Sequence, residues 1–320
     1  MEKSYPTTGK ALIVERLCKS YKDTKALSGV SFIAKRGELL GYLGPNGAGK
    51  TTTINILSGL LEPDSGRAEV YRIDVAADPI GVKQRLGVVP EESNLYPELT
   101  CRNNLIYAGE LYGLSKSERM SRADDLLHQF GLIDRSGKPF RSLSRGLKRR
   151  LTIAAALVHS PDVLFLDEPT AGLDVVSAMK LRSLIRDING AGTTVLLTTH
   201  NLREASDLCT RILILIGGRI VAEGTPSEIS ARVSSIKRLS VGLSQQLDLS
   251  DIREACKAIK SASIDGNELK VDVLDVHDAI AQIMTYVELR GGRILSIESV
   301  APSLEDAFIS ILEQHGEDGN

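Results

Sequence analysis

Gly44-Pro45-Asn46-Gly47-Ala48-Gly49-Lys50-Thr51 is the stretch of sequence that decides the fold of this chain. It fits the pattern G-x-x-x-x-G-K-[ST] at every fixed position. Residues 38–43 before it are typical of a buried strand, and residues 52–59 after it are typical of a helix that ends near a glycine. In that setting the glycines let successive backbone N–H groups point at phosphate oxygens, and the helix dipole adds to the attraction. Lys50 is expected to reach the outer phosphates and the Thr51 hydroxyl to hold Mg²⁺, so the sequence predicts a nucleoside triphosphate site.

Composition sets broad limits on what the chain can be. A length of 320 residues favours two domains, and a net charge near −2 gives no electrostatic reason to expect nucleic acid as a partner. No run approaches the roughly 18 to 20 apolar residues that span a bilayer. The cysteines are far apart and form no C-x-x-C pair, which indicates reduced thiols rather than a disulfide or zinc framework. We therefore expect a cytoplasmic protein, unless a partner tethers it to a membrane.

The first two thirds of the chain alternate between strand and helix patterns. Strand-like alternation over residues 11–43 is followed by helical periodicity over 99–130, and then by short β-rich runs at 163–167, 194–198 and 211–216. This order predicts an α/β fold with a mostly parallel sheet, antiparallel N-terminal strands and helices on the faces of the sheet. The helical block is too long for an ordinary crossover, so it is predicted to be an inserted subdomain of about residues 91–160.

The pattern changes after Gly224-Thr225-Pro226. Strand, helix, strand, strand, helix, strand are predicted at residues 238–243, 249–259, 262–264, 269–273, 276–289 and 293–300. This βαββαβ order matches the ferredoxin-like split βαβ plan. A last helix is expected to start at Ser303, which has capping-box spacing to Asp306. The predicted domains are therefore residues 1–230 and a small α+β domain of residues 231–320.

Two carboxylates follow the apolar run that ends at residue 166. The strands of a parallel sheet end at the edge where the phosphate loop lies, so Asp167 and Glu168 are expected beside the bound magnesium. Asp167 is suited to hold the ion through a water, and Glu168 to act as the base for the attacking water. An acidic pair at a strand end is common by itself, but next to this loop it indicates catalysis.

A second anion-binding surface is predicted at Leu143-Ser144-Arg145-Gly146-Leu147, which we call the signature segment. Ser144 is a candidate helix cap, and the N–H of Gly146 lies at the positive end of the helix that follows. The phosphate loop does not need this surface, so it implies another ligand or another copy of the protein. The alternative is a capped helix start with a solvated basic face.

Taken together, these motifs resemble those of the ATP-binding cassette (ABC) family over about residues 11–225. They stand in the family's order: the phosphate loop, the signature segment, Asp167-Glu168, residues 171–174, and His200 after the strand run at 194–198. The resemblance implies a P-loop ATPase that forms a head-to-tail dimer with two ATP molecules sandwiched between the copies.

The resemblance also implies roles for individual residues. The phosphate loop and Thr52 of one copy would face the same ATP as Ser144 and Gly146 of the other copy. His200 would contact the γ-phosphate and position Glu168. Asp174 would cross the dimer interface, and Tyr21 would stack on the adenine.

The chain departs from the family pattern at two places. Arg145 and Leu147 stand where Gly and Gln are common, and Glu91 stands where many members have Gln in the loop that joins the subdomains. The carboxylate of Glu91 can still ligate magnesium, and the alternative is a surface acid beside Glu92. These departures bear on the rate of hydrolysis more than on ATP binding.

The C-terminal region adds a second resemblance, to the drug-resistance and sodium-export ATPase branch. It rests on Gly224-Thr225-Pro226 and, further on, Pro302-Ser303-Leu304-Glu305-Asp306-Ala307-Phe308. Members of this branch are ATPase subunits paired with a separately encoded membrane permease. The resemblance implies the Mg²⁺- and ATP-dependent subunit of an exporter, acting as a homodimer or with a paired ATPase subunit at the cytoplasmic face of the membrane. Residues 95–99 are expected to help dock the permease, a solvated turn being the alternative.

Two other functions remain open at this point. One is an ATP switch with slow hydrolysis that acts on a soluble partner, which would suit Glu91 and Arg145. The other is a self-contained P-loop enzyme such as a kinase, which leaves the signature segment and His200 without a role. The C-terminal domain is expected to support the dimer or to regulate the ATPase.

Overall fold

The computed structural model describes residues 9–22, 24–232, 237–249, 251–273, 275–300 and 303–316. The chain divides into two units, residues 1–225 and residues 226–320, which we describe one at a time. Pro302, part of the C-terminal motif quoted above, lies outside the described residues. No helix in the described ranges is long and apolar enough to cross a membrane.

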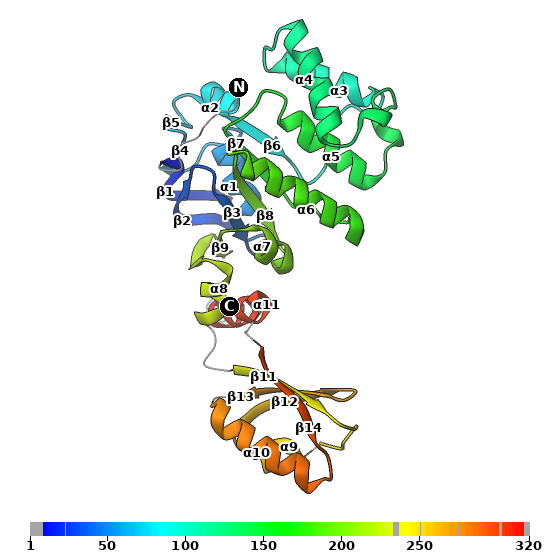
Figure 1. Ribbon diagram of the computed structural model, residues 1–320. Helices are drawn as coiled ribbons and strands as arrows, with labels where there is room; N and C mark the ends of the chain where they lie inside the picture. Colours follow the sequence, from blue (N-terminus) through cyan, green and yellow to red (C-terminus); the bar gives the residue numbers. More distant parts are fainter. Residues whose placement is uncertain are drawn as a thin grey trace. The chain divides into compact units, whose positions relative to one another are not determined.

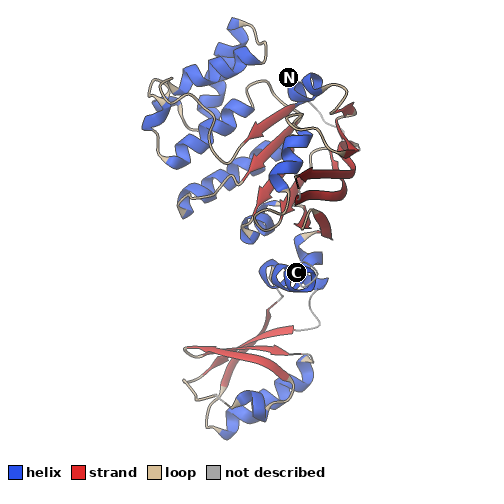
Figure 2. Ribbon diagram, turned by 180° about the vertical axis from the view of Figure 1, so that it is seen from behind, coloured by secondary structure: helices blue, strands red, loops and turns tan. Residues whose placement is uncertain are grey.

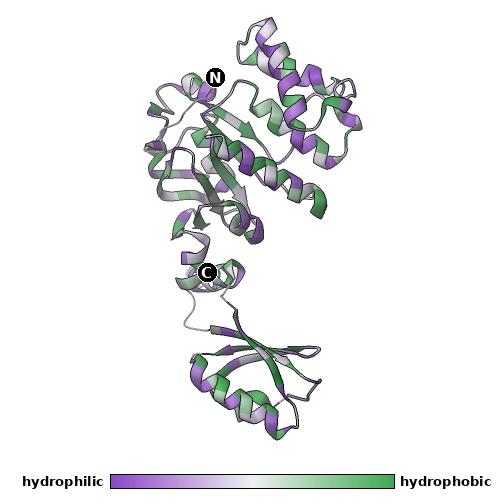
Figure 3. Ribbon diagram, in the orientation of Figure 1, coloured by the Kyte–Doolittle hydropathy of each residue, from purple (hydrophilic) through white to green (hydrophobic). Residues whose placement is uncertain are grey.

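A six-stranded sheet runs through the middle of the first unit (Figures 1 and 2). Its strands are, in spatial order, β10 (Arg219–Gly224), β9 (Arg211–Ile216), β3 (Leu39–Leu43), β8 (Thr194–Thr199), β7 (Val163–Asp167) and β6 (Leu86–Val89). Neighbours from β9 to β6 pair in parallel, and β10 pairs antiparallel with β9. Every residue of β3 and β8 is buried, and β3 is a nearly continuous apolar run, as expected of a strand that is covered on both faces, while hydrophobic residues colour much of this sheet green in Figure 3. The predicted parallel sheet is confirmed.

The N-terminal strands form a second, antiparallel sheet. It consists of β2 (Thr24–Lys35), β1 (Lys10–Tyr21), β4 (Ser65–Val70) and β5 (Ile73–Asp74). Leu12 of β1 and Phe32 of β2 belong to the same buried cluster as Tyr42 of β3, whose ring lies 5.6 Å from that of Phe32. The predicted antiparallel N-terminal strands are thus confirmed, and they share a core with the central sheet.

Helices α1 (Lys50–Leu57), α2 (Pro79–Arg85), α6 (Val175–Gly190) and α7 (Leu202–Leu208) accompany these sheets. A separate helical group is inserted between β6 and β7, made of α3 (Cys101–Leu111), α4 (Lys116–Gln129), the short 3-10 turns η1 (Ile133–Arg135) and η2 (Phe140–Ser142), and α5 (Arg145–Ala156). Figure 1 shows this group away from β1 and β2. Side chains cap each of its α-helices: Thr100 caps α3, Ser115 forms a capping box with Glu118 at α4, and Ser144 caps α5.

A half-buried histidine lies where the helical group returns to the sheet. The ring of His159, between α5 and β7, stacks on Tyr112 with 3.5 Å between ring centroids, and its Nε2 lies 3.3 Å from the carbonyl oxygen of Leu86. Burial lowers the pKa of His159 to about 4. The imidazole is therefore uncharged at neutral pH in the folded protein.

We expect this histidine to contribute to unfolding in acid. Its ordinary pKa is about 6.5, so the unfolded chain takes up a proton before the folded one does, and the free energy of unfolding falls as the pH drops from about 6.5 to 4. His159→Phe keeps a ring to stack on Tyr112 but cannot be protonated. Between pH 7 and 4.5 the variant should lose about 2 kcal/mol less stability than the wild type in urea unfolding. Parallel pH profiles for the two proteins would contradict this expectation.

The second unit contains a four-stranded antiparallel sheet of β12 (Ile259–Asp265), β13 (Glu268–Val273), β11 (Lys237–Leu243) and β14 (Ile294–Val300), in that spatial order. Helices α9 (Ile252–Ala255) and α10 (Val276–Leu289) follow β11 and β13 in the chain. Figure 2 shows α10 along one face of this sheet, and its Ile283 is buried in a cluster with Leu239 and Val271. This strand order and connectivity correspond to the split βαβ plan.

Two further helices, α8 (Pro226–Arg232) and α11 (Leu304–Gly316), come before and after this sheet in the sequence. One helix predicted in this unit is shorter than expected. Helix α8 packs on α11, which starts as expected with Ser303 and Asp306 in reciprocal hydrogen bonds. The helix predicted at residues 249–259 is wrong in extent, because α9 covers only Ile252–Ala255. The reason is the buried, β-branched Ile259, which pairs with Val273 and so starts β12 three residues earlier than predicted.

Candidate functional site

The phosphate loop joins β3 to α1 and has a backbone that only glycine accommodates. Gly47 and Gly49 have φ values of 80° and 107°, a region that side chains rarely adopt. A Cβ atom on Gly44 would lie 2.3 Å from the carbonyl oxygen of Leu215, and one on Gly49 would lie 2.5 Å from that of Ala26. The loop is also tied to the sheet, since the N–H of Gly218 donates to the carbonyl of Ala48 at 3.1 Å. These contacts fix the loop in the curled backbone conformation that the sequence predicts.

Lys50 folds back over this loop. Its Nζ donates to the carbonyl oxygens of Gly44, at 2.7 Å, and Pro45, at 3.1 Å, and the side chain is buried. Burial lowers the pKa of the Lys50 amine, whereas the carboxylates of Glu168, Asp167 and Glu91 act in the opposite direction. The predicted lysine is thus close enough to all three predicted acids to interact with their charges.

The acidic pair lies at the end of β7, on the same edge of the sheet as the loop. The Thr198 hydroxyl on β8 donates to Oδ1 of Asp167. Oε1 of Glu168 lies 2.8 Å from Nδ1 of His200, and the Glu168 side chain is only 10% exposed whereas that of His200 is 66% exposed. Glu168 has a φ of 46°, which is unusual for a residue with a side chain. Glu168 and His200, far apart in sequence, therefore form one hydrogen-bonded pair.

The donor set around the loop fits a magnesium-bound nucleotide. Thr51 presents an exposed hydroxyl side chain in the first turn of α1, and Asp167 and Glu91 supply carboxylates near Lys50. Within the described part of the chain, no group of three or more His, Cys, Asp and Glu side chains could hold a metal ion alone. Mg²⁺ suits such a place, because it is usually bound by one or two carboxylates together with phosphate and water oxygens.

The signature segment contacts a neighbouring helix of its own chain. Ser144 caps α5, and Nη1 of Arg145 donates to the carbonyl of Gly172 at 2.9 Å. A Cβ atom on Gly146 would lie 2.9 Å from Oγ of Ser177 in the first turn of α6. Asp174 caps α6 by accepting from the N–H of Ser177, and this interaction holds the pKa of Asp174 below its usual range. The structure therefore brings the signature segment beside residues 171–174.

The remaining predicted residues are less closely tied to the loop. Tyr21 ends β1, where it pairs with Thr24 of β2, and is 48% exposed. Thr52 is half-buried in α1, and the Glu91 side chain is exposed. The roles of these three residues, like those of the other predicted site residues, stay predictions.

Two buried charged residues near the acids were not predicted. Arg149 lies on α5, four residues before the buried Ile153, so its place on the apolar face of the helix was the available signal. Glu204 lies on α7 and is 1% exposed. Burial raises the pKa of Glu204 and Glu168 acts in the same direction, while the hydroxyls of Thr199 and Thr170 act against it.

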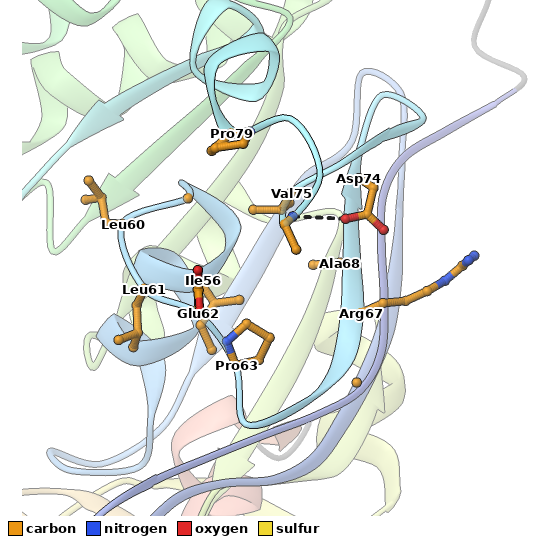
Figure 4. Close-up of a pocket in the computed structure, with 13 residues that line it drawn as sticks. Ile56, Leu60, Leu61, Glu62, Pro63, Arg67, Ala68, Asp74, Val75 and Pro79 are labelled. Atoms are coloured by element: carbon orange, nitrogen blue, oxygen red, sulfur yellow. Dashed lines mark hydrogen bonds between the residues drawn. The ribbon is translucent and has the colours of Figure 1, made fainter.

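A pocket of about 340 Å³ lies elsewhere in the first unit (Figure 4). It is lined by apolar residues such as Ile56, Leu61 and Val75 and lies at the C-terminal end of α1, opposite the end that starts with Lys50. The Asp74 carboxylate at its edge accepts the N–H of Ala76 at 2.9 Å. None of the predicted nucleotide-site residues lines this pocket, so the two features are separate.

Comparison with known proteins gives consistent matches. Residues 27–171 match a family model described as ABC transporter. The linearmycin resistance ATP-binding protein LnrL of Bacillus subtilis (strain 168) is 35% identical, with 94% of this chain and 97% of LnrL covered. The daunorubicin resistance ATP-binding protein DrrA3 of Streptomyces coeruleorubidus is 38% identical over 94% of this chain and 95% of its own length. The Nod factor export ATP-binding protein I of Paraburkholderia xenovorans (strain LB400) is 35% identical over 88% and 91%.

Solved structures agree for the first unit. An ATP-binding subunit of an ABC transporter superposes with a TM-score of 0.63 at 34% identity, covering 69% of this chain and 92% of that one. A dimeric ATP-binding cassette in a post-hydrolysis state, bound to ADP and Pi, gives a TM-score of 0.62 at 28% identity over 67% and 98%.

Proposed function

The chain belongs to the ABC transporter family, and from this membership we propose that it is the ATP-hydrolysing subunit of an exporter, driven by ATP-dependent closure of a dimer. The observation that carries the proposal is the Glu168–His200 pair at 2.8 Å, on the sheet edge that also presents the phosphate loop and Lys50. Export follows from the relatives, which are named for drug resistance and Nod factor export. We assign residues 1–230 as the nucleotide-binding domain and residues 231–320 as an accessory domain.

The chemical step is assigned to a small number of groups. Backbone N–H groups of the loop and the Nζ of Lys50 bind the phosphates. Glu168 takes a proton from a water whose oxygen attacks the γ-phosphorus, and the bond to the bridging oxygen breaks to leave ADP and phosphate. His200, which is hydrogen-bonded to Glu168, orients that water. Mg²⁺, held by Thr51, Asp167 and Glu91, would neutralise charge on the phosphates.

A second copy completes the site in this proposal. Ser144 and the first turn of α5, with Gly146, form an anion-binding helix start that would face the γ-phosphate on the other copy. Asp174 and Tyr21 are assigned to the dimer interface and the adenine. Because ATP would contact both copies, it favours the closed dimer, and hydrolysis removes that preference.

We assign docking of a separately encoded membrane permease to the turn at residues 95–99. The buried Asn104 shapes this turn: its Oδ1 accepts the N–H of Tyr96 at 2.9 Å, and its Nδ2 donates to the carbonyls of Tyr96 and Leu99. The Tyr96 ring is 50% exposed and packs edge-on against Tyr107, with centroids 5.0 Å apart. A rigid turn that presents an exposed tyrosine is suited to an interface. The chain would thereby lie on the cytoplasmic face of the membrane.

Copurification from native membranes tests this assignment. A multispanning subunit should copurify with the tagged full chain, and Tyr96→Ala should weaken its retention at least about fivefold, equivalent to about 1 kcal/mol, since tyrosine is enriched among the interface residues that cost most when truncated. Leu111→Ala is the matched control, because Leu111 is an exposed apolar residue of the same helical group. Capture of a soluble partner without any membrane subunit would contradict the exporter and favour the ATP switch.

A further inference from the structure

Helix α5 carries an arginine that is buried rather than exposed. Arg149 is 7% exposed, whereas its neighbour Arg150 is half-buried. A guanidinium taken out of water is costly unless its N–H groups meet acceptors. Burial lowers the pKa of Arg149, and the carboxylates of Asp167, Glu204, Glu91 and Glu168 act against that lowering.

The acceptors of Arg149 are backbone carbonyls on two other segments. Nε donates to the carbonyl of Pro169 at 3.0 Å, and Nη2 donates to that of Asp167. Nη1 donates to the carbonyl of Glu91, at 3.0 Å, and also to that of Pro90. One side chain therefore joins α5 to the turn after β7 and to the segment after β6.

The two carbonyls on the β7 turn flank Glu168. Glu168 has the left-handed φ of 46° and precedes a proline, and both features disfavour an ordinary residue in that conformation. Such strained backbone persists only where its surroundings fix it. Arg149 holds the carbonyls on either side, while the N–H of Glu168 donates to the carbonyl of Thr198 at 3.0 Å.

We infer that Arg149 is a positioning residue for hydrolysis: it holds Glu168 in the strained backbone that aims its carboxylate at His200, and it ties this backbone to Pro90 and Glu91. The inference rests on the proposed ATPase function. The loop and Lys50, which are proposed to bind the phosphates, lie on other elements, so Arg149 acts more on turnover than on ATP binding, although Asp167 and Glu91, whose carbonyls it holds, are also proposed to hold Mg²⁺. If Pro90 and Glu91 move, Arg149 moves with their carbonyls, and it thereby shifts the backbone on either side of Glu168.

The test compares Arg149→Ala and Arg150→Ala in the full chain, with kcat, KM and the Kd for ATP measured separately. Arg149→Ala is expected to lower kcat by about 100-fold and to change the ATP Kd by less than about threefold. Arg150→Ala, the same change on the same helix, should stay within about twofold of the wild type in both. Millimolar guanidinium ion should restore part of the lost kcat in Arg149→Ala, and urea at the same concentration should not.

Thermal unfolding shows whether the variants remain folded. If Arg149→Ala does not, Arg149→Lys gives the same readout, because a lysine keeps the charge but lacks the planar fork that meets carbonyls on two segments. Equal losses of kcat and ATP affinity, or an unchanged kcat, would overturn the inference. A wild-type chain that binds ATP and never hydrolyses it, alone or with its membrane partner, would contradict the proposed function instead.

Discussion

Glu168→Gln is expected to lower kcat for ATP hydrolysis by about 10²- to 10⁴-fold and to leave ATP binding nearly unchanged. Glutamine has the shape of glutamate, and its amide oxygen can still face His200, whose Nδ1 lies 2.8 Å from the Glu168 carboxylate. It cannot take the proton of the attacking water. The backbone that carries it, with its hydrogen bond from Glu168 N–H to the Thr198 carbonyl, does not depend on the side-chain charge.

Two measurements check this result. Single-turnover hydrolysis gives the chemical step, and size-exclusion chromatography with ATP shows whether the variant accumulates as a closed dimer. Glu92→Gln removes an exposed carboxylate next to Glu91 in the sequence and serves as the control. Hydrolysis by Glu168→Gln at a tenth or more of the wild-type rate would place the base elsewhere.

Gly49→Ala should have the largest effect on nucleotide binding. The new methyl group would lie 2.5 Å from the carbonyl oxygen of Ala26 and 2.7 Å from Leu27 Cδ2, at a φ of 107°. The loop must move to relieve these contacts. Lys50 moves with it, because it follows Gly49 directly and is the first residue of α1. We expect the affinity for ATP to fall at least about 100-fold, equivalent to about 2.7 kcal/mol.

Gly47→Ala separates strain from steric overlap. Gly47 also has a positive φ, of 80°, but no heavy atom would lie within 4 Å of a Cβ atom there. In this variant the free energy of unfolding should fall only by the roughly 1–2 kcal/mol that a left-handed backbone costs an ordinary residue, and ATP binding should weaken less than in Gly49→Ala. Fluorescent-nucleotide titration and thermal unfolding of both variants provide the comparison, and equal losses would show that crowding at Gly49 does not matter.

The features that sequence predicted here are those that depend on local spacing. The phosphate loop, the acids at the end of β7 and the apolar parallel strands each follow from a few consecutive residues. The βαββαβ order was likewise visible as alternating periodicity, although α9 proved shorter because Ile259 enters the sheet.

What sequence missed depends on tertiary packing. Arg149 stands in a basic run, and although its spacing to Ile153 places it on the apolar face of α5, only the folded chain brings the carbonyls of Glu91 and Pro169 to it. The positive φ of Glu168 cannot be inferred from its residue type, because glutamate normally avoids that region. Residues that act across segments are therefore the ones that a motif does not identify.

The left-handed backbone of Glu168 also means that stability and turnover favour different residues at this position. Glycine or asparagine would fit a φ of 46° with less strain, so selection for thermal stability alone would favour replacing the glutamate. Selection for turnover must retain it, since neither replacement can accept a proton from water. A library screened only by heat resistance would thus enrich stable, inactive chains at this site, a direct trade-off between stability and activity.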